Sequence, residues 1–365
     1  MIYILAFLWV FGILVLSHEL GHFLVAKLTG VKVLKFSVGF GSKLIGKKVG
    51  ETEYQISAFP LGGYVKLFGF NPEEKIVEKE RKKAFRYQPI RKRMPIIVAG
   101  SLSNFILGIL LFSIVYSVGT REIAPVVGEV IKGSPAQEAG IRPGDVILKM
   151  NDTEIAKWLD IPSIVHESEG RTLQLVLKRG VETITTRVTP RAATVKNIFN
   201  QEIKTYQLGI SASDQFVRYS EPIPEAIGKS FYRSWFIAKV TVISIVKMIQ
   251  RAVPAEENVG GPYTIGKMAG QVAQVGFIEL VRLTAVLSIS IGLINLFPIP
   301  ILDGGYLLLL AVEGIRRKPL SKKQIQVIQF IGYLIIMLLI SFVLYIEFKR
   351  ELFPDFIKFF QQITK

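Results

Sequence analysis

Two histidines four residues apart flank a glutamate within the first hydrophobic stretch of the chain, in the sequence His18-Glu19-Leu20-Gly21-His22. Residues four apart share one face of a helix, so both imidazoles can bind the same ion. The glutamate between them can then act as a general base for water at that ion. A glutamate in a membrane-spanning segment costs ~2.5 kcal/mol or more to insert, and such residues are usually functional. The pattern therefore predicts a catalytic zinc site, not a helix that carries two histidines by chance.

The third ligand of this site has one natural candidate. A catalytic zinc usually has three protein ligands and an open position for water. The chain has no cysteine, and its remaining histidine, His166, lies far along the sequence. Asp303 adjoins the third long hydrophobic stretch and follows the two prolines Pro298 and Pro300. A regular helix cannot continue through these prolines, and unwound backbone at membrane depth is tolerated where it is buried or lines a water-filled cavity. We expect Asp303 to complete the set His18, His22 and Asp303.

Four hydrophobic stretches are long enough to span a bilayer, for which about 20 residues are needed. They predict transmembrane segments at residues 1–30, 94–118, 279–312 and 324–347. The first stretch has no Lys or Arg before Lys27. Because a signal peptide begins with a positive region, we favour a retained helix over a signal peptide.

Charge predicts the orientation of these segments and explains the formal net charge of +16. Residues 30–94 contain 15 Lys and Arg against 6 Asp and Glu, whereas residues 119–218 contain 13 against 12. The short loop after the third segment is basic again. Positive loops face the cytoplasm, so we expect residues 31–93 and 313–323 inside, and both termini, including a tail at 348–365, outside. The interleaving of aromatic and basic residues typical of single-strand binding is absent, which argues against a nucleic-acid partner.

The segment between the second and third spans predicts a β-rich domain at 119–215. Ser134 and Pro135 suit the start of a short helix, and alternating apolar residues around Leu175 and from Ile184 predict strands. Residues 126–151 closely resemble bacterial PDZ domains, which bind peptides by adding a strand beside a helix. The expected groove helix spans 161–168 and contains His166, although a lone histidine of this kind is more often a surface residue.

Two further regions are predicted to meet the membrane. Residues 216–278 carry amphipathic helical patterning with aromatic and basic residues, which suits a helix lying on the membrane and equally a helix packed on the spanning bundle. Residues 31–67 indicate membrane-dipping strands with a turn region at Gly39 and Gly41. These glycines suit tight turns, and an exposed strand edge there can capture an unwound peptide. The fold class is therefore a polytopic α-helical membrane protein with four transmembrane helices, a membrane-associated β-hairpin region and an extracytoplasmic PDZ domain.

Taken together, the H-E-x-x-H in the first span and the N-x-x-P-x-P-x-L-D-G of the third resemble the site-2 protease family of intramembrane zinc metalloproteases. The PDZ-like insert resembles the bacterial RseP type, with one such domain where many members have two. The likeness runs along nearly the whole chain, and the segments that carry it outside the two motifs are Gly39-Phe40-Gly41, residues 60–66, and Gly100 with Asn104.

The resemblance implies a zinc endopeptidase that cleaves transmembrane segments of single-pass proteins, such as anti-sigma factors or signal-peptide remnants, often after another protease has removed their outer domain. It places the enzyme in the bacterial inner membrane, in contact with lipid. It gives Zn2+ to His18, His22 and Asp303 and makes Glu19 the base. Substrate contacts are expected from the following residues: Asn295, Asn104, Gly39, Phe40, Gly41 and Tyr64. Asn104 is equally suited to helix packing.

Two other classes of function compete with the protease. A membrane scaffold that presents a PDZ domain needs neither Glu19 nor a metal. A metal transporter needs several polar residues along a path, and the spans offer almost none beyond the one site. Zinc content separates the protease from the scaffold.

Overall fold

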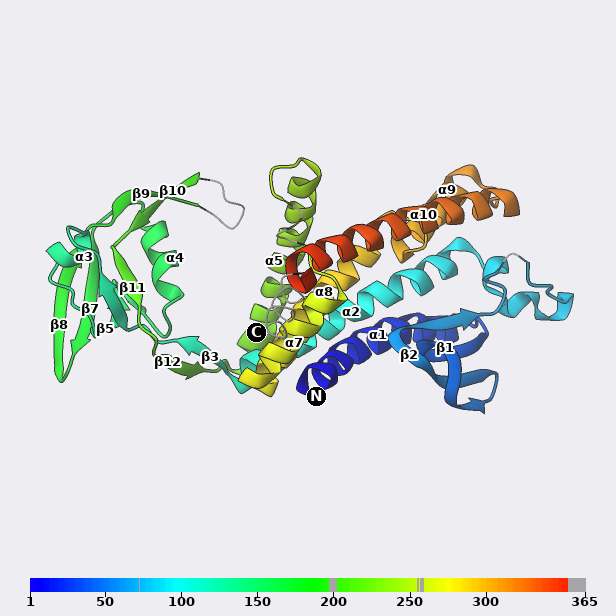
Figure 1. The fold of residues 1–365 in the computed structure, drawn as a ribbon, viewed down its shortest axis with the longest axis horizontal. Coiled ribbons are helices and arrows are strands. Elements are labelled where there is room, and N and C mark those ends of the chain that lie inside the picture. Colours follow the sequence, from blue (N-terminus) through cyan, green and yellow to red (C-terminus); the bar gives the residue numbers. More distant parts are fainter. Residues whose placement is uncertain (72, 197–201, 255, 257–258, 354–365) are drawn as a thin grey trace, which may run out of the picture. The chain divides into compact units, whose positions relative to one another are not determined.

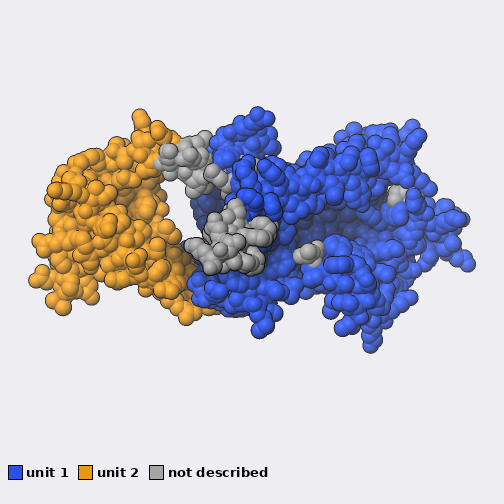
Figure 2. All heavy atoms as spheres, in the orientation of Figure 1, with its two compact units in different colours: residues 1–115, 227–365 blue, residues 116–226 orange. Residues whose placement is uncertain are grey.

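The computed structural model describes residues 1–71, 73–196, 202–254, 256 and 259–353. Most of the tail predicted outside the membrane, residues 354–365, lies outside the described residues. The chain forms two compact units, residues 1–115 together with 227–365, and residues 116–226 (Figure 2). The first unit contains every residue that the sequence predicts to bind metal.

Among the described residues, four helices are long and apolar enough to cross a membrane (Figure 1). They are α1 (Ile2–Leu28), α2 (Ile90–Val118), α8 (Phe277–Asn295) and α10 (Lys322–Glu347). The sequence prediction placed the start of the second span at residue 94, but α2 begins directly after Pro89. The basic residues at 91–93 lie in the first turn of this helix and do not prevent its formation.

Helices α1 and α2 cross at very short range around Gly21. A Cβ placed on Gly21 would lie 2.1 Å from the carbonyl oxygen of Ala99, so only glycine permits this approach. Ser17 and Ser103 exchange hydrogen bonds across the same crossing, each hydroxyl donating to the carbonyl of the other residue. The crossing fixes the face of α1 that carries both histidines against the middle of α2.

The third hydrophobic segment is broken, as the two prolines predicted. Helix α8 ends at Asn295, and α9 (Asp303–Arg316) begins after seven residues of irregular backbone. Ile301 has a φ of 94°, a conformation that is an outlier for a β-branched residue. The chain returns so tightly that a Cβ on Gly304 would lie 2.1 Å from the carbonyl oxygen of Leu296. This return places Asp303 at the first residue of α9.

Strands β1 (Val33–Val49) and β2 (Thr52–Leu67) form the β region that follows α1. Their register is repeatedly shifted, so that Ser37 has Tyr64 on one side and Gln55 on the other. Residues 35–38 are therefore interior to the sheet, and the other edge of residues 63–67 has no pairing partner among the described residues. Gly63 on this edge packs against α1, since a Cβ there would lie 3.1 Å from Cγ of Glu19.

Helices α5 (Ile223–Ile249) and α7 (Pro262–Val275) complete the larger unit, with short 3-10 helices at Glu78–Lys83 and Phe85–Tyr87 and a π-helical turn at Phe348–Leu352. Helix α7 lies against α1. Ser230 of α5 is buried and bonded to Ser113 of α2, whereas Tyr232 and Trp235 are exposed by 73% and 70%. One face of α5 is thus packed on the bundle and the aromatic face is free, and α5 runs across the direction of α2 in Figure 1.

The unit at 116–226 is β-rich, as predicted. Its four-stranded sheet has the order β6-β5-β7-β8, formed by Thr153–Glu154, Val146–Met150, Leu173–Arg179 and Glu182–Val188. Three two-stranded sheets complete the described part of the unit. They pair β3 (Thr120–Ile123) with β12 (Phe216–Tyr219), β4 (Val127–Val130) with β11 (Ile210–Ala212), and β9 (Arg191–Lys196) with β10 (Glu202–Gln207). Ser134 caps α3 (Pro135–Glu138) by accepting from the Gln137 N–H, and α4 (Asp160–Glu167) matches the expected groove helix. The core contains Ile147, Leu175 and Leu177.

Candidate metal centre and active site

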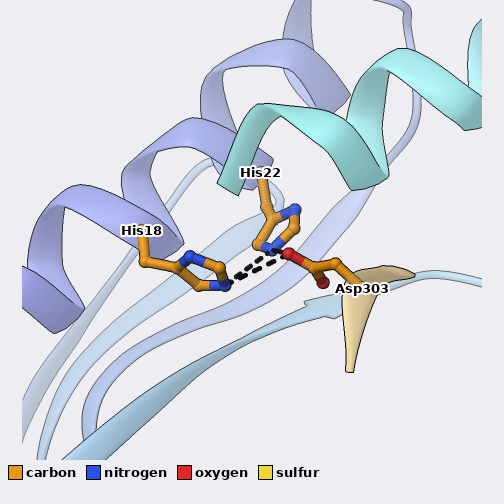
Figure 3. A group of neighbouring side chains, drawn as sticks. All are labelled: His18, His22 and Asp303. Atoms are coloured by element: carbon orange, nitrogen blue, oxygen red, sulfur yellow. Dashed lines mark hydrogen bonds and ion pairs between the residues drawn. The ribbon is translucent and has the colours of Figure 1, made fainter. Parts of the chain in front are cut away.

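His18, His22 and Asp303 come together in a small triangle of ligand atoms (Figure 3). The Oδ2 atom of Asp303 lies 3.4 Å from Nε2 of His18 and 3.5 Å from Nε2 of His22, and the two Nε2 atoms are 3.2 Å apart. The histidines come from successive turns of α1, and the aspartate comes from the start of α9. The two sequence motifs are thus joined at one point, although Asn295 follows His18 by 277 positions in the chain.

The spacing and chemistry of these atoms fit a zinc ion. Two imidazole nitrogens and one carboxylate oxygen are a common ligand set for catalytic zinc. Around a tetrahedral ion with ligands at about 2.0–2.1 Å, neighbouring donor atoms are about 3.3–3.4 Å apart. The three observed separations of 3.2–3.5 Å agree with that geometry. All three side chains are half-buried, so the fourth direction is open.

The open direction leads into a cavity of about 710 Å³ that Glu19 also lines. Most of its wall is apolar and comes from α1, β2, α2 and the irregular segment before α9. The lining residues other than those that carry chemistry include Phe11, Leu14, Val15, Val65, Phe70, Ile97, Ile291, Ile301 and Leu302. The cavity therefore offers a mostly apolar chamber with one carboxylate base and one set of metal ligands.

The tautomer of His22 is set by its neighbour on α2. Nδ1 of His22 is 2.8 Å from the carbonyl oxygen of Ile96. A carbonyl only accepts, so His22 donates from Nδ1 and presents the lone pair of Nε2 to the metal site. Nδ1 of His18 is 3.5 Å from the side-chain amide of Asn295. The amide atom placed there is Nδ2, so a proton on Nδ1 of His18 requires the opposite orientation of the amide, with Oδ1 facing the ring.

Some of the residues predicted to contact substrate line the cavity, and others do not. Phe40 and Tyr64 both line the cavity, with their rings stacked 6.3 Å apart. Gly39 and Gly41 lie within strand β1 and not in a turn as predicted: their φ values of 93° and 86° accompany a register irregularity opposite Phe59. Neither glycine is among the lining residues. Asn104 lines the cavity but is fully buried, and neither atom of its amide has a hydrogen-bond partner among the described residues.

Several contributors to the site carry no chemical signature in the sequence. Gly100 leaves room for both imidazoles, since a Cβ there would lie 2.2 Å from His22 Nε2 and 2.8 Å from His18 Cε1. Ser101 donates to Asp303, and the Ile96 carbonyl fixes His22. Only their position could have identified them, because all three belong to the stretch of α2 that crosses the face of α1 carrying the histidines.

His166 takes no part in this centre. It belongs to the unit at 116–226, where its Nδ1 lies 3.3 Å from the Thr205 hydroxyl and its side chain is exposed. The expectation that a histidine here is a surface residue agrees with this position.

Comparison with known proteins places the whole arrangement in one family. The sequence model of peptidase family M50 matches residues 6–339. The chain belongs to this family. Proteins named "putative zinc metalloprotease" align with nearly the full length of this M50 chain. That of Brucella suis is 35% identical and the alignment covers 94% of each chain, and that of Clostridium acetobutylicum is 35% identical over 90% of this chain and 92% of its own.

Among solved structures, the PDZ domain of an SdrC-like protein from Listeria monocytogenes matches 24% of this M50 chain and 86% of that chain, with 19% identity and a TM-score of 0.20. The family, the relatives' names and the four apolar helices agree on a membrane metallopeptidase.

Proposed function

We propose that this M50 peptidase is an intramembrane zinc endopeptidase that cleaves the spanning segments of single-pass membrane proteins. One observation carries the proposal: the triangle of His18, His22 and Asp303 opens, with Glu19, into an apolar cavity between apolar helices. An unwound hydrophobic peptide suits such a cavity, and a soluble polar substrate does not. Anti-sigma factors and signal-peptide remnants are substrates of the required kind.

His18, His22 and Asp303 would hold the zinc. The ion, when bound, supplies Lewis-acid activation of water and of the scissile carbonyl. Glu19 accepts the proton of the attacking water and returns it to the leaving amine. The Ile96 carbonyl holds His22 so that its Nε2 faces the ion, and the Asn295 amide lies beside Nδ1 of His18. The apolar wall excludes bulk water from the site, which strengthens each of these electrostatic interactions.

A helical substrate has to be unwound before its peptide bond can be attacked. The outer edge of β2 at residues 63–67, where Gly63 lies beside Glu19, offers backbone groups to an extended peptide, in the manner of strand addition. The stacked rings of Phe40 and Tyr64 lie beside this edge, and the irregular backbone of β1 at Gly39 and Gly41 positions Phe40. Asn104 and Asn295 contribute amide groups to the substrate backbone, and the unpaired amide of Asn104 gains a partner in this way.

The orientation inferred from charge completes the proposal. The basic segments 31–93 and 313–323 face the cytoplasm of a bacterial inner membrane, and both termini and the unit at 116–226 lie outside. We infer that the outer unit is a PDZ domain that selects substrates already trimmed by another protease. The free aromatic face of α5 lies on the lipid surface.

The proposal is tested with purified enzyme in detergent or liposomes. Glu19→Gln should keep stoichiometric zinc, because Glu19 is not a ligand, and cleavage should fall by at least about 10²–10⁴-fold. Glu53→Gln, at a surface ion pair with Lys43, is the control and should leave cleavage unchanged. Asp303→Ala should lose zinc and activity together.

Two outcomes contradict the proposal. Stoichiometric zinc in Asp303→Ala excludes Asp303 as a ligand. A wild-type protein that purifies free of metal and cleaves nothing favours the competing function, a membrane scaffold.

The substrates themselves can be identified by comparing membrane proteomes from cells with wild-type enzyme and from cells with Glu19→Gln. Substrates are the proteins whose single-pass fragments accumulate in the variant.

A further inference from the structure

Ser101 on α2 donates a hydrogen bond to Asp303, the third proposed metal ligand. Its Oγ donates to Oδ2 of Asp303 at 3.4 Å, the same oxygen that faces both imidazoles. Ser101 is fully buried, and the two residues are 202 positions apart in the sequence. We propose that Ser101 is a positioning residue that orients Asp303 toward the metal, an inference that rests on the proposed zinc site.

The bonding of Ser101 differs from that of other hydroxyl residues in the apolar helices. A serine or threonine in a helix commonly donates to the carbonyl four residues earlier. Ser113 donates to Ile109 in this way, and Thr284 donates to Leu280. Ser113 also bonds the Ser230 hydroxyl of α5, whereas the hydroxyl of Ser101 reaches a carboxylate on another helix, that of Asp303. This choice of partner points to a role at Asp303 and not to satisfaction of the hydroxyl alone.

The position of Ser101 is fixed by packing that does not involve Asp303. A Cβ on Gly292 of α8 would lie 3.0 Å from the carbonyl oxygen of Ser101, so α8 is pressed against this turn of α2. The neighbouring Gly100 lies directly against the two imidazoles. Because α2 is held on both sides, the hydroxyl is presented from a rigid support, as an effective outer contact requires.

Asp303 needs such a contact because its own support is irregular. It follows Ile301, which has a positive φ, and it is the first residue of α9. A free carboxylate can rotate about its terminal torsion, which is broad and two-fold. The hydroxyl selects the oxygen that faces His18 and His22, and the metal then binds a site that is already formed. Loss of an outer contact of this type usually costs 10–100-fold in metal affinity.

The test measures zinc and does not depend on cleavage. All variants are made in the full chain carrying Glu19→Gln, and zinc affinity is measured by competition with a chelator. Ser101→Ala should weaken zinc binding by about 10–100-fold, and Ser101→Thr, which keeps the hydroxyl, should restore most of the affinity. Ser113→Ala on the same helix is the matched control and should bind zinc as the parent does. With Co2+ in place of zinc, the visible spectrum of Ser101→Ala should change and that of Ser113→Ala should not.

The possible results are distinguishable. Zinc affinity of Ser101→Ala within about twofold of the parent overturns the role of Ser101 and leaves the proposed function intact. An equal loss in Ser113→Ala also overturns it, because the effect then reflects general loosening of α2. A parent protein that binds no zinc overturns the proposed function and this inference together.

Discussion

The imidazole of His22 on α1 packs directly against the Cα atom of Gly100 on α2, so that a Cβ built on Gly100 would lie 2.2 Å from Nε2 of His22. Real atoms do not approach so closely, and the imidazole is fixed from its other side by the Ile96 carbonyl. The metal site therefore requires the absence of a side chain on the neighbouring helix as much as it requires the ligands themselves.

Gly100→Ala should displace the imidazole and lower zinc affinity by about 10–100-fold, comparable to loss of an outer contact. Zinc content after chelator challenge measures the effect, and cleavage should fall in parallel. Gly12→Ala is the matched control, because Gly12 is on α1 with nothing within 4 Å of its Cβ position. Alanine at Gly12 should be neutral or slightly favourable for the helix. Equal zinc binding in both variants would contradict the steric argument.

The contrast between ligands and their supports shows what the sequence can predict. His18, Glu19, His22 and Asp303 could be named from residue type, spacing and hydrophobic context, and the break before Asp303 followed from two prolines. The main elements of the outer unit were also predictable from alternation and turn residues. Gly100, Ser101 and Ile96 could not be assigned roles, because glycine, serine and a backbone carbonyl acquire them only where α2 crosses α1 and approaches α9. The interior position of residues 35–38 depends likewise on a long-range register that alternation does not encode.

The ion pair of Arg93 and Glu313 should matter for stability. It joins the first turn of α2 to the last turn of α9 through two hydrogen bonds, with side-chain exposures of 9% and 17%. Arg93→Gln leaves the carboxylate buried without its partner, and we expect a loss of about 3–5 kcal/mol in the free energy of unfolding. Thermal unfolding in detergent measures this loss. The exposed Arg91→Gln is the control, and the double variant Arg93→Gln/Glu313→Gln should recover most of the stability.

Membrane orientation can be tested with single cysteines, because the chain has none of its own. Cysteine in place of Arg81 should resist an impermeant thiol reagent added outside intact cells, since the basic segment is expected in the cytoplasm. Cysteine in place of Val181, which is 98% exposed, should react. Both should react after the membrane is permeabilised. The opposite labelling pattern before permeabilisation would overturn the inferred topology.

Asp145 should stabilise the outer unit in a pH-dependent manner. Burial would raise the pKa of Asp145, but the hydrogen bonds and charge of Arg179 and the Arg142 N–H outweigh this and hold the pKa below its ordinary value. A carboxyl with a lowered pKa in the folded state stabilises it above the ordinary pKa, about 3.9, and loses that contribution as the pH falls through the folded value. Amide protection factors for residues 116–226 should therefore drop in acid. At neutral pH, Asp145→Asn should lower them about tenfold or more, and the exposed Asp152→Asn should not.

The last prediction concerns the outer unit and substrate choice. Residues 126–212 can be removed with little strain, because the Ser213 N–H donates to the Val126 carbonyl at 3.0 Å and the ribbon of β3 with β12 closes the stem. The shortened enzyme should keep its zinc and its hydrolytic activity, since His18, Glu19, His22 and Asp303 all belong to the other unit. If the unit is a gate, substrates with intact outer domains should be cut more readily after the deletion. If it recruits newly formed C-termini, cleavage of trimmed substrates should slow instead. We favour the gate, and the measurement is the ratio of cleavage rates for full-length and trimmed substrate in both enzymes. An unchanged ratio would exclude both roles and leave residues 126–212 as a structural insert.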